Sequence, residues 1–357
     1  MSTRLAIFFA AVATIAVAAP SPARDAFRDV LDTPASISPL AARSLINGLA
    51  RAGTRLVAVG QRGHVLISDD QGRSWSQAQV PLTADLVAVS FPDDRHGWAV
   101  GHDGVVLHTD DAGATWQAQL DGRRTGALVL EQANRQAAAL TATDPKRAQA
   151  LLADATRFAE HSIENPWLDV WFSDPSNGFV VGAFGMVLRT TDGGRSWESW
   201  LHAADNPKGL HLYAVRGIGD DVFIVGEQGL VLKLDRDAGR FRALELPYNG
   251  TLFGIAGNER AIVVHGLRGS VLRSVDGGRS WQAVNTGLQV GLTANARVDD
   301  GRLVLVSQAG HVLVSRDEGA TFAAASLQRP LPAAAVVAAS SAVIVGGPRG
   351  LQSLSLP

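Results

Sequence analysis

Five aspartates recur at one place in a short pattern, and their carboxylates are the first groups whose chemistry must be considered. The pattern is Ser/Thr-x-Asp-x-Gly-x-Ser/Thr followed by an aromatic residue. The acids are Asp70, Asp111, Asp192, Asp276 and Asp317, and the tryptophans that close four copies are Trp75, Trp116, Trp197 and Trp281. Carboxylates serve as general acids, general bases and metal ligands. These acids recur once per repeat and would be spread apart in space. We therefore interpret them as structural turn residues that accept backbone N–H groups.

Other arrangements that could carry catalysis are sparse. A glycosidase needs two acids across a cleft, and Asp103 with Glu227 is the one pair we can propose. A sialidase needs a tyrosine nucleophile, and the chain offers Tyr213 and Tyr248 without an Arg-Ile-Pro segment. The nine histidines form no His-x-His or His-Glu-x-x-His motif, and there is no cysteine for thiolate chemistry, disulfides or a lipid anchor. The sequence predicts no catalytic residues, no metal site and no cofactor.

Charged turn residues offer recognition chemistry instead. Gly-containing turns separate the two apolar runs of the repeated pattern, between the second and third expected strands of each blade, and vary in sequence. They carry Arg62, Arg268 and Arg349 in repeats one, five and seven. They carry Asp103 and Glu227 in repeats two and four, and Phe184 in repeat three. Arginine suits bidentate contact with carboxylates. We predict that these turns bind a partner, with the arginines docking an acidic protein segment, and solvated turn arginines are the alternative.

The spacing of the pattern predicts the elements that carry these residues. Closing aromatics lie at positions 75, 116, 197, 241, 281 and 322, so most intervals are 40–44 residues and one is about twice that length. Such a period with several short apolar runs is typical of propeller blades. The fourth copy is degenerate and the seventh, 341–356, is truncated. We predict an all-β, seven-bladed β-propeller of four-stranded blades. The last blade lacks its outer strand, which we expect Phe27–Leu31 to supply, closing the ring.

An insertion at about 123–165 breaks the β pattern. Gly126–Leu140 and Lys146–His161 are rich in helix-forming residues, with Asp144 and Pro145 as a helix start between them. We predict a helical hairpin on the face that carries the Gly turns. A docking arm and a surface elaboration both remain open as its role.

The overall composition excludes several classes of protein. The chain has 357 residues with 32 basic and 34 acidic side chains, so its net charge is −2. That balance argues against a nucleic-acid binder, and 46% hydrophobic residues suffice for a large core. Residues 1–23 are typical of a secretory signal, with Arg4, an apolar Leu5–Ala19 and cleavage near Ala23. An uncleaved anchor is the alternative. We expect residues 24–357 to form one exported, periplasmic domain that uses the general secretory route.

The extended pattern V-G-x-x-G-x-(V/I)-L-x-(S/T)-x-D-x-G-x-(S/T)-W resembles the photosystem II stability/assembly factor family and its Asp-box (BNR) repeats. The resemblance covers the chain from 24 onward except about 122–165. It implies a seven-bladed propeller that assists assembly of a membrane complex, and in a non-phototroph a partner of a resistance–nodulation–division exporter.

We therefore predict a non-catalytic, exported scaffold, monomeric, that binds a membrane protein or complex of the cell envelope. It should bind no nucleic acid and insert into no membrane after signal cleavage. The alternative is a glycan-binding or glycoside-hydrolysing Asp-box propeller, which carbohydrate screening would distinguish.

Overall fold

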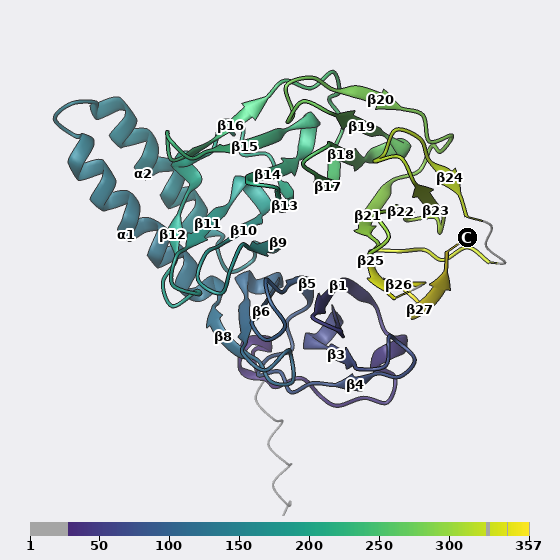
Figure 1. Cartoon of the computed structure of the whole chain (residues 1–357). Coiled ribbons are helices and arrows are strands. Elements are labelled where there is room, and N and C mark those ends of the chain that lie inside the picture. Colours follow the sequence, from purple (N-terminus) through teal and green to yellow (C-terminus); the bar gives the residue numbers. More distant parts are fainter. Residues whose placement is uncertain (1–27, 326–328, 341, 357) are drawn as a thin grey trace, which may run out of the picture.

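A computed structural model of the chain describes residues 28–325, 329–340 and 342–356, so the predicted signal sequence lies outside the described residues. Seven antiparallel sheets stand around a common axis, each ordered from its innermost strand outward (Figure 1). The first sheet contains β1 (Ile46–Ala52), β2 (Arg55–Gly60), β3 (Val65–Ser68) and β4 (Ser76–Gln77). The second contains β5 (Leu86–Ser90), β6 (Gly97–Gly101), β7 (Val106–Thr109) and β8 (Gln117–Leu120). The third contains β9 (Trp167–Phe172), β10 (Gly178–Gly182), β11 (Val187–Thr190) and β12 (Glu198–Ser199).

The remaining four sheets repeat the same order, which confirms the predicted propeller architecture of seven sheets. The fourth sheet contains β13 (Leu212–Ile218), β14 (Asp221–Gly226), β15 (Val231–Asp235) and β16 (Arg240–Leu244), and the fifth contains β17 (Leu252–Asn258), β18 (Ala261–Gly266), β19 (Val271–Ser274) and β20 (Gln282–Val284). The sixth contains β21 (Leu292–Arg297), β22 (Leu303–Ser307), β23 (Val312–Ser315) and β24 (Ala323–Ala324). The seventh contains β25 (Ala335–Ala339), β26 (Ala342–Gly347) and β27 (Gly350–Ser355).

The core lies between neighbouring sheets. Every residue of β6, β10 and β22 is buried, because each of these second strands is covered by a neighbouring sheet on both faces. The ring of Trp98 in β6 stacks on Phe172 in β9, with 3.5 Å between ring centroids. Apolar contacts of this kind recur from sheet to sheet and set the position of every turn on the two ends of the propeller.

The seventh sheet has three strands, and the N-terminal segment does not add the fourth. Val30–Asp32 forms a 3-10 helix, and the carbonyl of Val30 accepts the N–H of Thr83 (2.8 Å). Leu31 packs into the apolar cluster between the first and second sheets. The expected edge strand is therefore wrong for residues 28–31, while Phe27 lies outside the described residues. The first and seventh sheets instead pack through an apolar cluster that contains Leu56, Val337 and Ile344.

The insertion forms the expected helical hairpin, α1 (Gly122–Leu140) and α2 (Pro145–Glu160). Asp144 caps α2 as predicted, accepting the N–H of Arg147 at 3.0 Å. Helix α1 starts four residues earlier than predicted, because Asp121 caps it through the N–H of Arg123. Gly126 lies inside α1 rather than at its start, and a Cβ there would come within 2.6 Å of Ser162 Oγ. The glycine lets the two ends of the hairpin approach closely.

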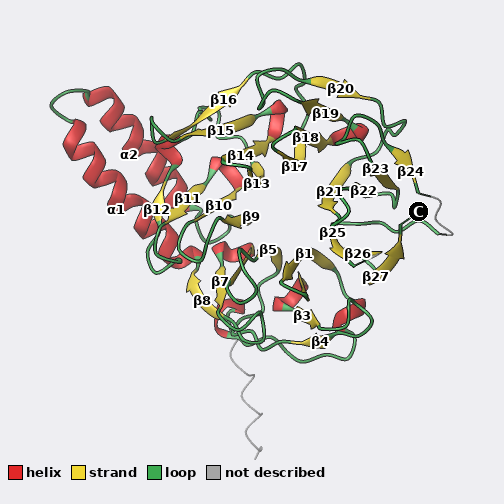
Figure 2. Cartoon of the chain, in the orientation of Figure 1, coloured by secondary structure: helices red, strands yellow, loops and turns green. Residues whose placement is uncertain are grey.

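The hairpin projects outward from the rim of the propeller. It begins beside the turn His102–Gly104, which lies on the predicted face. From there α1 runs along β12, where the side chain of Gln132 bonds both the N–H and the carbonyl of Ser199. Figure 2 shows both helices projecting from the rim of the ring rather than standing on one face, which corrects the expected direction. Within the described residues, neither helix is long and apolar enough to span a membrane.

Candidate partner-binding face and hairpin groove

In five of the seven sheets, the turn between the second and third strands has one unusual backbone conformation. The middle residues of these turns adopt left-handed φ angles although they are not glycine, namely Arg62 (56°), Asp103 (56°), Phe184 (55°), Gln228 (52°) and Arg268 (55°). Residues other than glycine are disfavoured at a left-handed φ, so the backbone of each of these turns is strained. Because these turns occupy equivalent positions in their sheets, they lie at the same end of the propeller. We call this end the Gly-turn face.

The three arginines predicted to bind a partner are all exposed on this face. The backbone N–H of Arg62 donates to the carboxylate of Asp85 (2.7 Å), which holds the turn and leaves the side chain free. Within the described residues, the guanidinium groups of Arg62, Arg268 and Arg349 make no ion pair and no hydrogen bond. Their fork-shaped donors are therefore available to an external carboxylate.

A fourth arginine, Arg43, was missed by the sequence analysis. It ends the 3-10 helix Ala41–Arg43, which contacts β27. Arg43 adjoins the turn that carries Arg349, because a Cβ added to Gly350 in that turn would lie only 2.6 Å from the Cα of Arg43. Arg43 is exposed. It lies before the first repeat, so no periodic signal identifies it.

The acidic residues and Phe184 are arranged differently. The carboxylate of Glu227 accepts the backbone N–H of His211 (2.9 Å) and thereby braces a neighbouring loop. Asp103 is half-buried beside the start of α1, and burial, reinforced by Asp29 and Asp85, raises the pKa of its carboxyl. The ring of Phe184 is 58% exposed and meets His211 edge-on at 4.8 Å. The Gly-turn face thus holds an exposed aromatic ring as well as free arginines.

The repeated aspartates lie at the opposite end, between the third and fourth strands of their sheets. In the first repeat, Asp70 accepts the N–H of Ser74 (2.9 Å) and the hydroxyls of Ser68 and Ser74. These bonds, led by that from the Ser74 hydroxyl, lower the pKa of Asp70 to about 2. The indole N–H of Trp75 donates to the carbonyl of Gly72 (3.2 Å). Equivalent carboxylate bonds recur at Asp111, Asp192, Asp276 and Asp317. Each of these carboxylates therefore accepts hydrogen bonds from its own turn, as a structural role requires.

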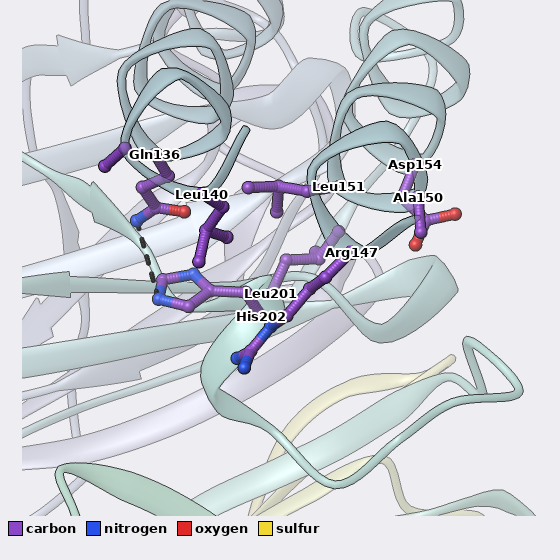
Figure 3. A pocket seen from close by; sticks show the side chains of 9 residues that line it. Gln136, Leu140, Arg147, Ala150, Leu151, Asp154, Leu201 and His202 are labelled. Atoms are coloured by element: carbon purple, nitrogen blue, oxygen red, sulfur yellow. Dashed lines mark hydrogen bonds between the residues drawn. The ribbon is translucent and has the colours of Figure 1, made fainter. Parts of the chain in front are cut away.

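A separate groove lies at the far end of the hairpin. It has a volume of about 480 Å³ and is bounded by α1, α2 and the 3-10 helix Leu201–Ala203 (Figure 3). Leu140, Leu151 and Leu201 form its apolar walls, and Arg147 and His202 supply nitrogen donors. Nowhere in the part of the chain that the structure describes, the groove included, do three His, Asp or Glu side chains gather as a metal site would require.

Comparison with known proteins assigns a family to this arrangement. The family model described as "Photosynthesis system II assembly factor YCF48" matches residues 50–145 and 149–333. A Synechococcus protein named "Photosystem II assembly lipoprotein Ycf48" is 31% identical over 162 residues, which cover 44% of this chain and 48% of that protein. The chain thus spans about half the length of the curated relatives it matches. These relatives are named lipoproteins, whereas this chain contains no cysteine.

Solved structures share the fold at low sequence identity. One described as "YCF48 bound to D1 peptide" superposes with a TM-score of 0.63 at 15% identity, covering 88% of this chain and 94% of that one. The virginiamycin B lyase of Staphylococcus aureus superposes comparably, with a TM-score of 0.64 at 10% identity over 91% of this chain and 99% of the lyase. At such identities the likeness shows the propeller fold alone. The family match rests on the repeats themselves and covers most of the chain, and this protein therefore belongs to the YCF48 family of photosystem II assembly factors.

Proposed function

We propose that this protein is an exported, non-catalytic scaffold that helps assemble a membrane protein complex of the cell envelope. It acts in the periplasm as a monomer, and its Gly-turn face captures an acidic, extended segment of the partner. In a host without a photosystem, the partner would be an exporter of the resistance–nodulation–division type.

One observation carries the proposal: the Gly-turn face holds arginines that nothing within the described residues neutralises. Arg349 and Arg43 lie side by side, and Arg62 belongs to the adjoining first sheet. Unpaired guanidinium groups attract carboxylates over a Debye length of about 8 Å at physiological ionic strength. They then bind carboxylates through paired hydrogen bonds. A relative whose structure is described as holding a D1 peptide supports a peptide as the ligand class.

A glycan-active propeller remains the alternative, and the raised pKa of Asp103 would suit its general acid, but the second acid is engaged elsewhere. Glu227, one of the two acids that such an enzyme would use, already holds the His211 N–H. The five repeated aspartates are saturated by their own turns. We therefore propose binding rather than hydrolysis.

Charge reversal tests the proposal. A tagged variant with Arg62→Glu, Arg268→Glu and Arg349→Glu should capture its membrane partner from solubilised envelopes at least about tenfold less well, because each charge-assisted hydrogen bond contributes about 1.5–3 kcal/mol. The control carries Arg73→Glu, Arg195→Glu and Arg279→Glu, which make the same change of charge at the Asp-box end. The control should capture normally. Equal capture by both variants, with circular dichroism unchanged, would contradict the proposed face.

A further inference from the structure

The groove at the tip of the hairpin is distinct from the Gly-turn face. Its three walls come from elements far apart in the sequence: Leu140 ends α1, Leu151 lies in α2, and Leu201 follows β12. All three leucines are only partly buried. Elsewhere on the hairpin, apolar residues such as Val129, Ala155 and Phe158 are buried against the second and third sheets. The groove is therefore a partly open apolar surface between the hairpin and the segment that follows β12, and Leu151 also packs against the buried cluster.

The size of the groove matches a small molecule. Its volume of about 480 Å³ lies within the range of about 300–1,000 Å³ that ligand pockets usually occupy. Its walls are largely aliphatic and would take the hydrocarbon body of a ligand. They would leave the backbone amides of a bound peptide without hydrogen-bond partners, which is costly.

One end of the groove carries an unpaired arginine, although the carboxylate of Glu198 also acts on the nearby His202. Arg147 is exposed, and within the described residues its guanidinium has no ion pair and no hydrogen bond. Figure 3 shows it beside the ring of His202, which lies 3.4 Å from the amide nitrogen of Gln136. The acid of the groove, Asp154, is paired with Arg157 (3.3 Å) and points away from His202 in the same view. An anionic group is thus favoured at this end.

We propose that the groove binds a free long-chain carboxylate of the fatty acid class. The hydrocarbon chain lies between Leu140, Leu151 and Leu201. The carboxylate receives hydrogen bonds from Arg147, with the amide of Gln136 as a second donor. The assignment rests on two complementary features, aliphatic walls of ligand size and one unpaired cation at their end. It does not depend on the function of the Gly-turn face.

The test is displacement of fluorescent dansyl-undecanoic acid from the purified full chain. Dodecanoate should displace the probe, and dodecyltrimethylammonium, which has the same chain and the opposite charge, should do so at least about tenfold less well. Arg147→Gln should weaken dodecanoate about tenfold, as expected for one hydrogen bond to a charged group. The same change should not weaken the cationic amphiphile. Arg135→Gln, which removes an exposed arginine of α1 outside the groove, should leave dodecanoate binding unchanged.

A second pair of variants tests the walls. Ala150→Glu places a carboxylate on the groove wall and should abolish displacement, whereas Ala153→Glu, exposed on α2 outside the groove, should not. Equal displacement by the two amphiphiles, or an Arg147→Gln variant that binds dodecanoate normally, would overturn the proposal. Displacement by an acidic leucine-rich peptide but not by dodecanoate would replace it with a peptide site.

Discussion

His265 shows how a single buried residue joins two blades. Its ring is fully buried in β18, where Nδ1 lies 2.9 Å from the carbonyl of Leu292 and Nε2 lies 2.9 Å from the amide of Asn295. Both partners belong to β21 of the next sheet. An amide N–H can donate to Nε2 only when that nitrogen is unprotonated, and Nδ1–H then donates to the carbonyl. The contact therefore needs the neutral imidazole.

The stability of the propeller should consequently fall in acid. Burial lowers the pKa of His265 from 6.5 to about 4, while the hydrogen bond to Leu292 opposes this shift. Above pH 6.5 the ring is neutral in both folded and unfolded chains. As the pH falls toward 4, only the unfolded chain gains the proton, so up to about 3 kcal/mol of stability is lost.

Urea unfolding of the wild type and His265→Gln between pH 7 and 4 measures this dependence. The His265→Gln variant should be less stable than the wild type at pH 7 and should lose less stability on acidification. The control, His161→Gln, removes an exposed ring and should show the same pH dependence of stability as the wild type. Parallel pH profiles for the wild type and His265→Gln would show that the buried ring does not govern acid stability.

At the scale of elements, the hairpin depends on close contact between its two ends. Replacing glycine by alanine inside a helix normally stabilises it by about 0.5–1 kcal/mol. At Gly126 the opposite should hold, because the new Cβ would lie 2.6 Å from Ser162 Oγ and 3.2 Å from the carbonyl of Ala159. Such overpacking costs about 1–3 kcal/mol.

Hydrogen exchange of the hairpin amides tests that contact. Gly126→Ala should accelerate exchange in residues 122–160, whereas Asn134→Ala, on an exposed position of α1, should slow exchange or leave it unchanged. Slower exchange in Gly126→Ala would mean that helix propensity outweighs the contact.

The sequence predicts elements better than their placement. Each repeat encodes its strands locally, and six of the seven sheets contain the four strands that were predicted for a blade. The direction of the hairpin depends on the contact of Gln132 with Ser199, 67 residues away, which no local pattern reveals. The position of Val30 depends likewise on Thr83. Arg43 joins the Gly-turn face only because the N-terminal segment reaches β27.

For the whole molecule, the two ends of the propeller differ in chemistry. At the Asp-box end the carboxylates are saturated within their turns, and these bonds lower the pKa of Asp317 to about 2 although burial opposes them. At the other end, strained turns expose Arg62, Arg268 and the ring of Phe184, and Arg349 is exposed in the corresponding turn of the last sheet. This asymmetry is the basis for placing the partner on the Gly-turn face.

Site-specific photo-crosslinking in intact envelopes tests that placement most directly. A photoreactive residue would replace Leu267, Ala309 or Pro348, which are exposed in turns of the Gly-turn face, or Arg73 or Arg279 at the Asp-box end. The products would be identified by mass spectrometry. The account predicts one membrane protein crosslinked from all three Gly-turn positions and from neither Asp-box position. Crosslinks to that protein from the Asp-box end alone, or equally from both ends, would contradict it.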